Sequence, residues 1–246
     1  MAGRNYKKMI KALLDKAEHP NTNPEEAAAC AAKAAELMMR FGIDAAQLRK
    51  ESGRKPEDIE MFTLELPGDH GTVLIEALYP IAQAMGAKCV VIDGDLVMVG
   101  TVSMLENLEI LLASLQLQMI GSSNAAGDAH EAKLRKQHPD WDDELIADMT
   151  DRWVWDYIRG FGRGVAEKIA KKRQIIIDES PGNELVLQTE QDRIRAQFHK
   201  MFPHLRPMRQ QGYSSAAAQR EGFAAGKMAD VGDGYVGGQA TRALTR

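Results

Sequence analysis

The chain has 246 residues and a net charge of −4, and 44% of its residues are hydrophobic. This composition excludes a disordered chain and is sufficient for a buried core divided over two or three small modules. No window reaches the roughly 18 apolar residues of a membrane span, and Met1 to Lys11 lack the apolar core of a signal peptide. We therefore expect a soluble cytoplasmic protein without a membrane partner.

Charge is distributed unevenly along the chain. Residues 61–151 contain 4 basic and 15 acidic residues, whereas residues 152–173 contain 7 basic and 2 acidic residues. Residues 193–246 are basic again, with 9 basic and 3 acidic residues. Such asymmetry bears on the choice of binding partner and does not bear on the fold.

Residues 1–52 predict an N-terminal helical module. Apolar residues recur at helical spacing over residues 6–18, where the first helix should end before a proline. Asn23 can cap a second, alanine-rich helix. We expect Gly42 to end that helix in the left-handed conformation, and Asp44 to cap a short third helix.

A polar linker at residues 53–60 precedes a predicted central α+β domain at residues 61–178. Alternating apolar residues over 62–66 indicate a half-buried strand, and residues 74–85 indicate a helix closed by glycine. Two apolar runs then flank Asp93-Gly94-Asp95, a strong hairpin signal. A leucine-rich helix follows, so the pattern predicts a three-stranded β-α-β-β-α unit covered by helices.

The rest of the chain is predicted to be mostly helical. Residues 121–127 indicate a break between helices, and residues 175–177 fit either a short strand or a buried helix end. Pro181-Gly182 indicates a turn. Residues 179–246 form a predicted C-terminal helical region with a flexible, glycine-rich tail. Together these patterns predict a helix-rich α+β fold.

Two sequence details bear on packing. Cys30 and Cys89 lie in apolar surroundings, which predicts two small buried side chains without a disulfide. The segments 160–164 and 222–226 share the motif Gly-Phe-x-x-Gly. Glycines one helical turn apart allow two helix backbones to approach closely, so this motif favours helix packing. The alternative is a backbone surface that contacts a partner.

No segment carries a recognisable catalytic, cofactor or metal signature. His130-Glu131 begins like a zinc-peptidase helix, but the next histidine follows eight residues later instead of four. Residues 160–164 lack the lysine and serine or threonine that end a phosphate-binding loop. Asp93 and Asp95 are better explained by the hairpin than by a cation. We predict no catalytic residue, no metal and no cofactor, although catalytic groups need converge only in space.

Basic residues toward the C-terminus are the most informative remaining feature. The candidates for binding nucleic acid are Arg159, Arg163, Lys168, Lys171, Lys172, Arg173, Arg206 and Arg209, and the aromatic residues Phe198, Phe202 and Tyr213 accompany them. Lysine and arginine neutralise phosphates, and aromatic faces stack on bases. The alternative is a solvated helix face whose charge balances the acidic segment 61–151.

Four short motifs resemble a known family. They are Ile10-Lys-Ala-Leu-Leu-Asp-Lys-Ala17, Asn23-Pro-Glu-Glu-Ala27, Ala32-Lys-Ala-Ala-Glu-Leu-Met38 and Phe41-Gly-Ile-Asp44. Over residues 6–46 the chain resembles the domain of unknown function numbered 2786. Residues 97–100, 111–118 and 155–164 are similar to the companion domain that commonly follows it, and residues 222–230 are similar to tails seen in the same group. The resemblance implies a phage or mobile-element origin and a bacterial host cytoplasm, and it implies no activity.

These observations lead to one functional hypothesis and two alternatives. We expect a non-enzymatic phage or mobile-element accessory protein that binds nucleic acid through its basic C-terminal helices. The first alternative is a protein-interaction factor that acts on a host or defence protein through its acidic middle segment. The second is an enzyme of unrecognised type. The sequence leaves the oligomeric state open.

Overall fold

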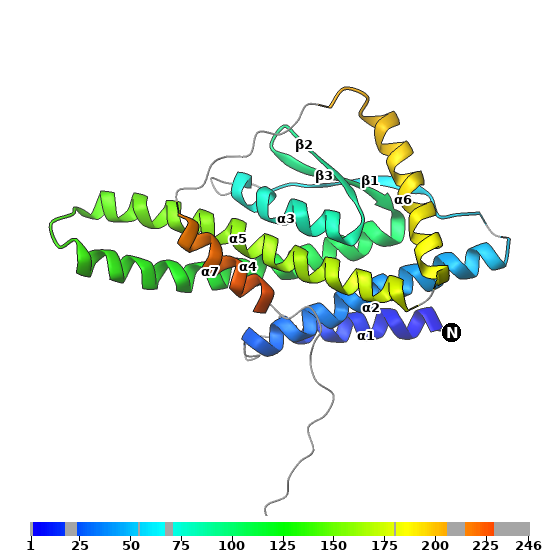
Figure 1. The fold of residues 1–246 in the computed structure, drawn as a ribbon, viewed down its shortest axis with the longest axis horizontal. Coiled ribbons are helices and arrows are strands. Elements are labelled where there is room, and N and C mark those ends of the chain that lie inside the picture. Colours follow the sequence, from blue (N-terminus) through cyan, green and yellow to red (C-terminus); the bar gives the residue numbers. More distant parts are fainter. Residues whose placement is uncertain are drawn as a thin grey trace, which may run out of the picture.

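The computed structural model describes residues 2–17, 24–53, 55–66, 71–179, 181–205 and 215–228. Within them the order is α1 (Ala2–Ala17), α2 (Pro24–Glu51), β1 (Ile59–Leu64), α3 (Gly71–Met85), β2 (Lys88–Ile92), β3 (Asp95–Thr101), α4 (Val102–Gln137), α5 (Asp143–Asp178), α6 (Pro181–Met201) and α7 (Ala216–Met228). The predicted helix-rich α+β class is confirmed, and Figure 1 shows long helices around one small sheet.

The three strands form an antiparallel sheet in the order β1-β3-β2. Asp93 and Gly94 join β2 to β3, and both have positive φ values, 53° and 96°. Two such residues match the twist of a tight hairpin, so the predicted hairpin is confirmed. Gly86 has a φ of 110° and follows the end of α3, as the sequence predicts.

Both faces of β3 are covered. Leu96 and Met98 belong to the main hydrophobic core with α3 and α5, whereas Val99 packs against Ile194 and Phe198 of α6. Successive side chains of a strand point to opposite faces. The helix α6 therefore closes the face of the sheet that α3 leaves open, as the ribbon in Figure 1 also shows.

The helix α2 continues through Gly42 to Glu51, so the predicted end at Gly42 and the separate helix capped by Asp44 are wrong. The side chains before and after the glycine explain the continuity, because Met39 and Ile43 are both buried in the core. Burial of these residues outweighs the roughly 1 kcal/mol that a helical glycine costs. The left-handed glycine occurs instead at Gly53, with a φ of 63°.

Two further boundaries differ from the prediction, and one alternative is decided. The helix α4 runs unbroken through residues 121–127, because Gly127 is packed against Val154 of α5 rather than placed at a turn. Residues 175–177 lie at the end of α5, where Ile176 is buried, so the buried helix end is confirmed and the short strand is wrong. Pro181 begins α6 instead of forming a turn, since proline suits the first turn of a helix.

The repeated Gly-Phe-x-x-Gly motif packs α5 against α7. A Cβ on Gly160 would clash with the carbonyl oxygen of Gln219, and a Cβ on Gly222 would clash with that of Tyr157. Likewise, a Cβ on Gly164 would clash with the carbonyl oxygen of Phe223, and a Cβ on Gly226 would clash with that of Phe161. The helix-packing interpretation of this motif is therefore confirmed.

The opposite side of α5 is equally close to α3. A Cβ on Gly162 would clash with the backbone of Ala77 in α3. Three glycines within five residues thus allow α5 to contact the backbones of two helices at once. Because α3 also packs against the sheet, this contact connects the sheet to α7 through α5.

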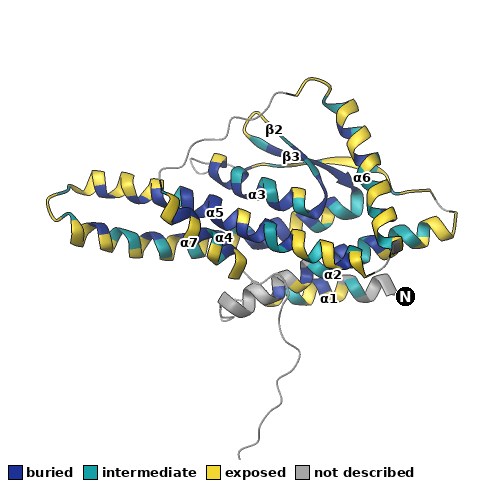
Figure 2. Ribbon diagram, in the orientation of Figure 1, coloured by how far each residue is buried: buried dark blue, intermediate teal, exposed yellow. Residues whose placement is uncertain are grey.

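One buried cluster includes residues from Ile10 in α1 to Ala218 in α7. Figure 2 shows this burial along α3, β3 and the inner faces of α4 and α5. Cys30 and Cys89 are both buried and no disulfide joins them, as predicted. Division into modules at 1–52, 61–178 and 179–246 stays a prediction, and the predicted flexible tail lies outside the described residues. None of the described helices has the length and apolar character needed to cross a membrane.

Substitution of glycine by alanine should have opposite effects at two helical positions. Gly222→Ala should lower the free energy of unfolding by about 1–2 kcal/mol, because overpacking against Tyr157 exceeds the gain in helix propensity. Gly121→Ala should raise it by about 0.5–1 kcal/mol, because a Cβ there meets open space. Urea denaturation measures both values, and stabilisation by both substitutions would contradict the packing.

Candidate functional site

Arg159, the first predicted nucleic-acid contact, lies inside the protein. Its guanidinium forms salt bridges with Glu76 of α3 and with Asp156, whose Oδ1 lies 3.1 Å from Nη1. The other oxygen of Asp156 accepts a hydrogen bond from the Ser215 backbone N–H at 2.7 Å. Ser215 in turn accepts a bond from the N–H of Ala218 and caps α7. Arg159 therefore links α3, α5 and the start of α7.

Lys172 and Arg173 also face neighbouring helices. The Lys172 Nζ lies 3.7 Å from Glu36 Oε2 of α2, and both side chains are largely buried. Arg173 donates to the carbonyl oxygen of Ala84 at the end of α3, at 3.4 Å. Burial lowers the pKa of Arg173, since it disfavours the charged form. These two cations connect the C-terminal half of α5 to α2 and α3.

Arg163, Lys168 and Lys171 lie on the side of α5 that carries α7. Arg163 donates to the Gln219 side chain of α7 at 3.2 Å, and Lys168 donates to the carbonyl oxygen of Lys227 at 3.1 Å. Lysine near the C-terminus of a helix interacts favourably with the helix dipole. The side chains of Arg163 and Lys168 thus extend from α5 onto α7.

One carboxylate joins the lysines of the two helices. Glu167 Oε1 lies 2.7 Å from Lys171 Nζ and 3.0 Å from Lys227 Nζ. We define the α5–α7 face as Arg163, Glu167, Lys168, Lys171 and Lys227. Hydrogen bonds from Lys171 and Lys227 lower the pKa of Glu167, so it stays ionised at neutral pH. Among the five described residues of this face, four cations and one anion leave three positive charges in excess.

Lys227 was not among the predicted contacts, because it lies 56 residues after Lys171 in the chain. The signal that could have identified it is the repeated glycine motif, which predicts the pairing of α5 with α7. The lysine also lies over the ring of Phe223, with Nζ 5.1 Å from the ring centroid. Tertiary packing therefore adds a cation that no local pattern indicates.

The other predicted residues do not join this face in the described part of the chain. Arg206, Arg209 and Tyr213 lie outside the described residues. Phe198 is buried against the sheet, and its ring centroid lies 5.2 Å from that of Phe202. Phe198 and Phe202 lie near basic residues in the sequence because α6 has one apolar side, which packs on the sheet.

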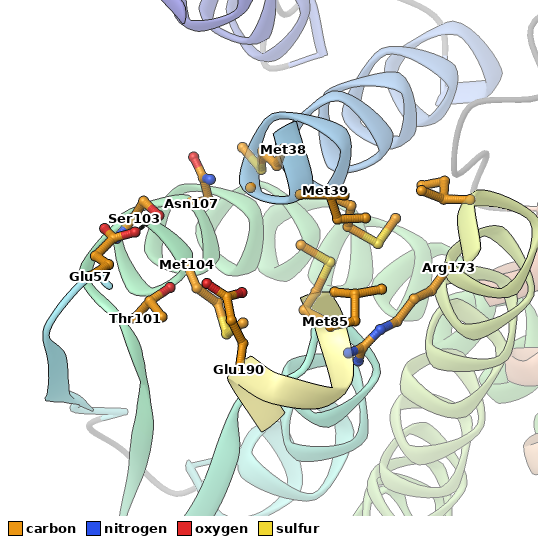
Figure 3. Close-up of a pocket in the computed structure, with 14 residues that line it drawn as sticks. Met38, Met39, Glu57, Met85, Thr101, Ser103, Met104, Asn107, Arg173 and Glu190 are labelled. Atoms are coloured by element: carbon orange, nitrogen blue, oxygen red, sulfur yellow. Dashed lines mark hydrogen bonds between the residues drawn. The ribbon is translucent and has the colours of Figure 1, made fainter. Parts of the chain in front are cut away.

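A second polar site lies where α2, α4, α5 and α6 meet (Figure 3). Glu57 accepts hydrogen bonds from the backbone N–H and the hydroxyl of Ser103, at 2.7 and 2.9 Å, and thereby caps the first turn of α4. The cavity beside it has a volume of about 50 Å³. This volume suits a few water molecules and is too small for an organic ligand.

Glu190 of α6 points into the same cavity, with Thr101 and Met104 to one side and Arg173 to the other (Figure 3). Burial and the nearby Glu57 carboxylate raise the pKa of Glu190, although neighbouring arginines oppose this change. Sequence reasoning missed Glu57 and Glu190, since 133 residues separate them. Among the described residues, no group of three His, Cys, Asp or Glu side chains could hold a metal ion.

Loss of the Arg159 side chain should destabilise the fold strongly. In Arg159→Ala, the free energy of unfolding should fall by about 3–5 kcal/mol, because Glu76 and Asp156 would be left buried without their cation. Arg152→Ala is the matched control on the same helix. Its pair with Asp148 is exposed, so the expected loss is at most about 1 kcal/mol. Equal losses in urea denaturation would contradict the structural role of Arg159.

Comparison with protein families identifies the N-terminal part of the chain. Residues 7–45 match the model of a protein of unknown function, DUF2786, in agreement with the resemblance over residues 6–46. The match covers most of α1 and the larger part of α2. No curated protein and no solved structure matches the chain significantly. The family model therefore supports the N-terminal domain, and the companion domain stays a prediction.

Proposed function

We propose that this chain is a nucleic-acid-binding accessory protein that contacts phosphates through its α5–α7 face. The supporting observation is the gathering of Arg163, Lys168, Lys171 and Lys227 from two helices on one face, where Glu167 pairs with Lys171 and Lys227. Lysine and arginine neutralise phosphates and release counterions, which drives association. A face with three positive charges in excess suits this role.

The chemistry of the face favours binding without sequence preference. Lysine binds phosphate as a point charge, and phosphate contacts position a nucleic acid without reading its bases. The half-buried Phe223 ring already contacts Lys227, so the proposed affinity comes mainly from the cations. On sequence grounds, Arg206 and Arg209 stay candidates for the same role.

The biological setting belongs to the same proposal. The N-terminal match to DUF2786 supports the resemblance from which we infer a phage or mobile-element origin. A cytoplasmic location in a bacterial host follows from that inference, whereas the non-catalytic role rests on the lack of a catalytic signature in the sequence. The α5–α7 face would then act on nucleic acid already present in the same compartment.

Charge reversal at two lysines tests this proposal. The variant Lys171→Glu/Lys227→Glu should bind labelled DNA more weakly than the wild type, because two phosphate contacts are lost. The slope of log K against log salt should fall by about 0.9 for each lost contact with duplex DNA. Fluorescence anisotropy of single-stranded and duplex DNA and RNA, over about 50–200 mM salt, measures both effects.

The control carries the same charge change elsewhere. Lys133→Glu/Lys136→Glu alters two exposed residues of α4 outside the α5–α7 face, and its affinity should decrease much less. Circular dichroism establishes that each variant is folded. Equal loss in both variants, or no binding by the wild type at low salt, would show that this face does not bind nucleic acid.

A protein-interaction role is the alternative, and it is favoured by the C-terminal end of α4 and the N-terminal end of α5. These ends extend beyond the rest of the fold (Figure 1), and residues 121–151 contain eight acidic and three basic residues. Leu145 and Met149 are exposed there, at 41% and 37%. The alternative predicts that a host or defence protein is captured and that capture persists when Lys171 and Lys227 are reversed. The same capture should be lost when the acidic residues within 121–151 are changed.

A further inference from the structure

A larger cleft adjoins the small cavity and opens between the C-terminal end of α2 and α6. Its volume is about 360 Å³, within the range of about 300–1,000 Å³ typical of small-molecule sites. Its polar lining includes Arg49, Lys50, Glu57, Glu190 and Arg193. None of these residues belongs to the α5–α7 face, so the cleft is independent of the proposed function.

Two arginines in this cleft are oriented by one residue. Arg49 Nη1 lies 2.9 Å from the Glu57 carboxylate, and Arg193 Nη2 donates to the Glu57 backbone carbonyl oxygen at 2.7 Å. A guanidinium has five N–H groups, and each of these contacts occupies one of them. Both groups therefore keep donors for a ligand, and their positions are set before it binds. Such preorganisation reduces the entropic cost of binding.

The balance of charge in the cleft favours an anion. Lys50 adds a third cation beside the two arginines. The Glu57 carboxylate is already occupied by Ser103 at the start of α4 and by Arg49. Glu190 is the second carboxylate of the lining; burial and the adjacent Glu57 raise its pKa, whereas Arg193, Arg49 and Arg173 oppose this change. Three cations thus face two carboxylates, so the described lining of the cleft carries one positive charge in excess.

The rest of the lining is mostly apolar and consists of Ala46, Gly53, Pro56, Val186 and Thr189, whose hydroxyl donates to the Leu185 carbonyl oxygen. A ligand that fills this space would need an apolar or planar part beside its anionic group. A phosphate group offers several strong acceptor oxygens and up to two negative charges. It suits cations on both α2 and α6 better than a carboxylate, which has one charge and two oxygens.

We propose that this cleft binds a small organic phosphate, with the phosphate group between Arg49 and Arg193 and the organic part against Pro56 and Val186. Lys50 adds a further ionic contact at the edge. Glu57 is a positioning residue, because it holds both arginines and makes no contact of its own with the phosphate. The junction of α2 and α6 is thus assigned as a ligand-binding site.

Isothermal titration calorimetry of the full chain tests this assignment, with inorganic phosphate and a nucleoside monophosphate as probes. Ionic strength is held constant with sodium chloride. The wild type should bind both probes, and the monophosphate should bind more tightly because of the apolar wall. Arg193→Gln should raise Kd about tenfold or more, as expected for loss of a charge-assisted hydrogen bond. Arg195→Gln, two residues along α6 and outside the cleft, should leave Kd unchanged.

A second variant guards against a folding defect, because Arg193→Gln also removes the hydrogen bond to Glu57. Lys50→Gln changes an exposed side chain on α2 and should raise Kd severalfold with unchanged Tm. The assignment is overturned if neither probe binds, or if both variants bind like the wild type. Equal affinity for succinate and for the monophosphate would overturn the choice of phosphate over carboxylate.

Discussion

The close approach of α5 to both α3 and α7 is the contact on which the rest of the structure depends. Gly160 and Gly164 remove side chains on the side of α7, and Gly162 removes one on the side of α3. Backbones at this distance gain many small dispersion contacts that any side chain at these positions would prevent. The Arg159 salt bridges connect the same three elements by polar contacts. Apolar and ionic interactions thus act together to fix the relative positions of α3, α5 and α7.

This arrangement divides the basic residues of α5 into two groups with different roles. Arg159, Lys172 and Arg173 point toward α2 and α3 and help to hold the helices together. Lys168 and Lys171 lie beside α7, where Lys227 joins them. The basic residues of one sequence segment, 159–173, therefore form an internal set and a surface set, because a helix distributes successive residues around its axis.

The elements set by local rules could be predicted from the sequence. The hairpin at Asp93-Gly94 follows from the positive φ values that its turn requires, and the packing of α5 with α7 follows from the glycine motif. The errors also concern glycine and proline. Gly42 and Gly127 were expected near breaks, but Gly42 lies between the buried Met39 and Ile43 of α2, and Gly127 gives room to Val154 of α5.

The candidate sites were only partly predictable for a related reason. Lys168 and Lys171 could be identified from charge alone. Arg159, in contrast, lies inside the protein in a salt bridge with Glu76, which precedes it by 83 residues in the chain. No pattern in the sequence indicates that Glu57 orients Arg193, because 136 residues separate them. Contacts between distant residues decide which charges face solvent, and a single sequence does not reveal those contacts.

The central claim is that docking of α7 onto α5 creates the cationic face, and one substitution tests it without changing any charge. Gly226→Leu should displace α7, because a side chain there would overlap the backbone of Phe161. Hydrogen exchange should then show fast exchange in α7 with the sheet still protected, and DNA anisotropy should show a clear loss of affinity. Unchanged affinity and salt dependence in a variant whose α7 is displaced would contradict the account.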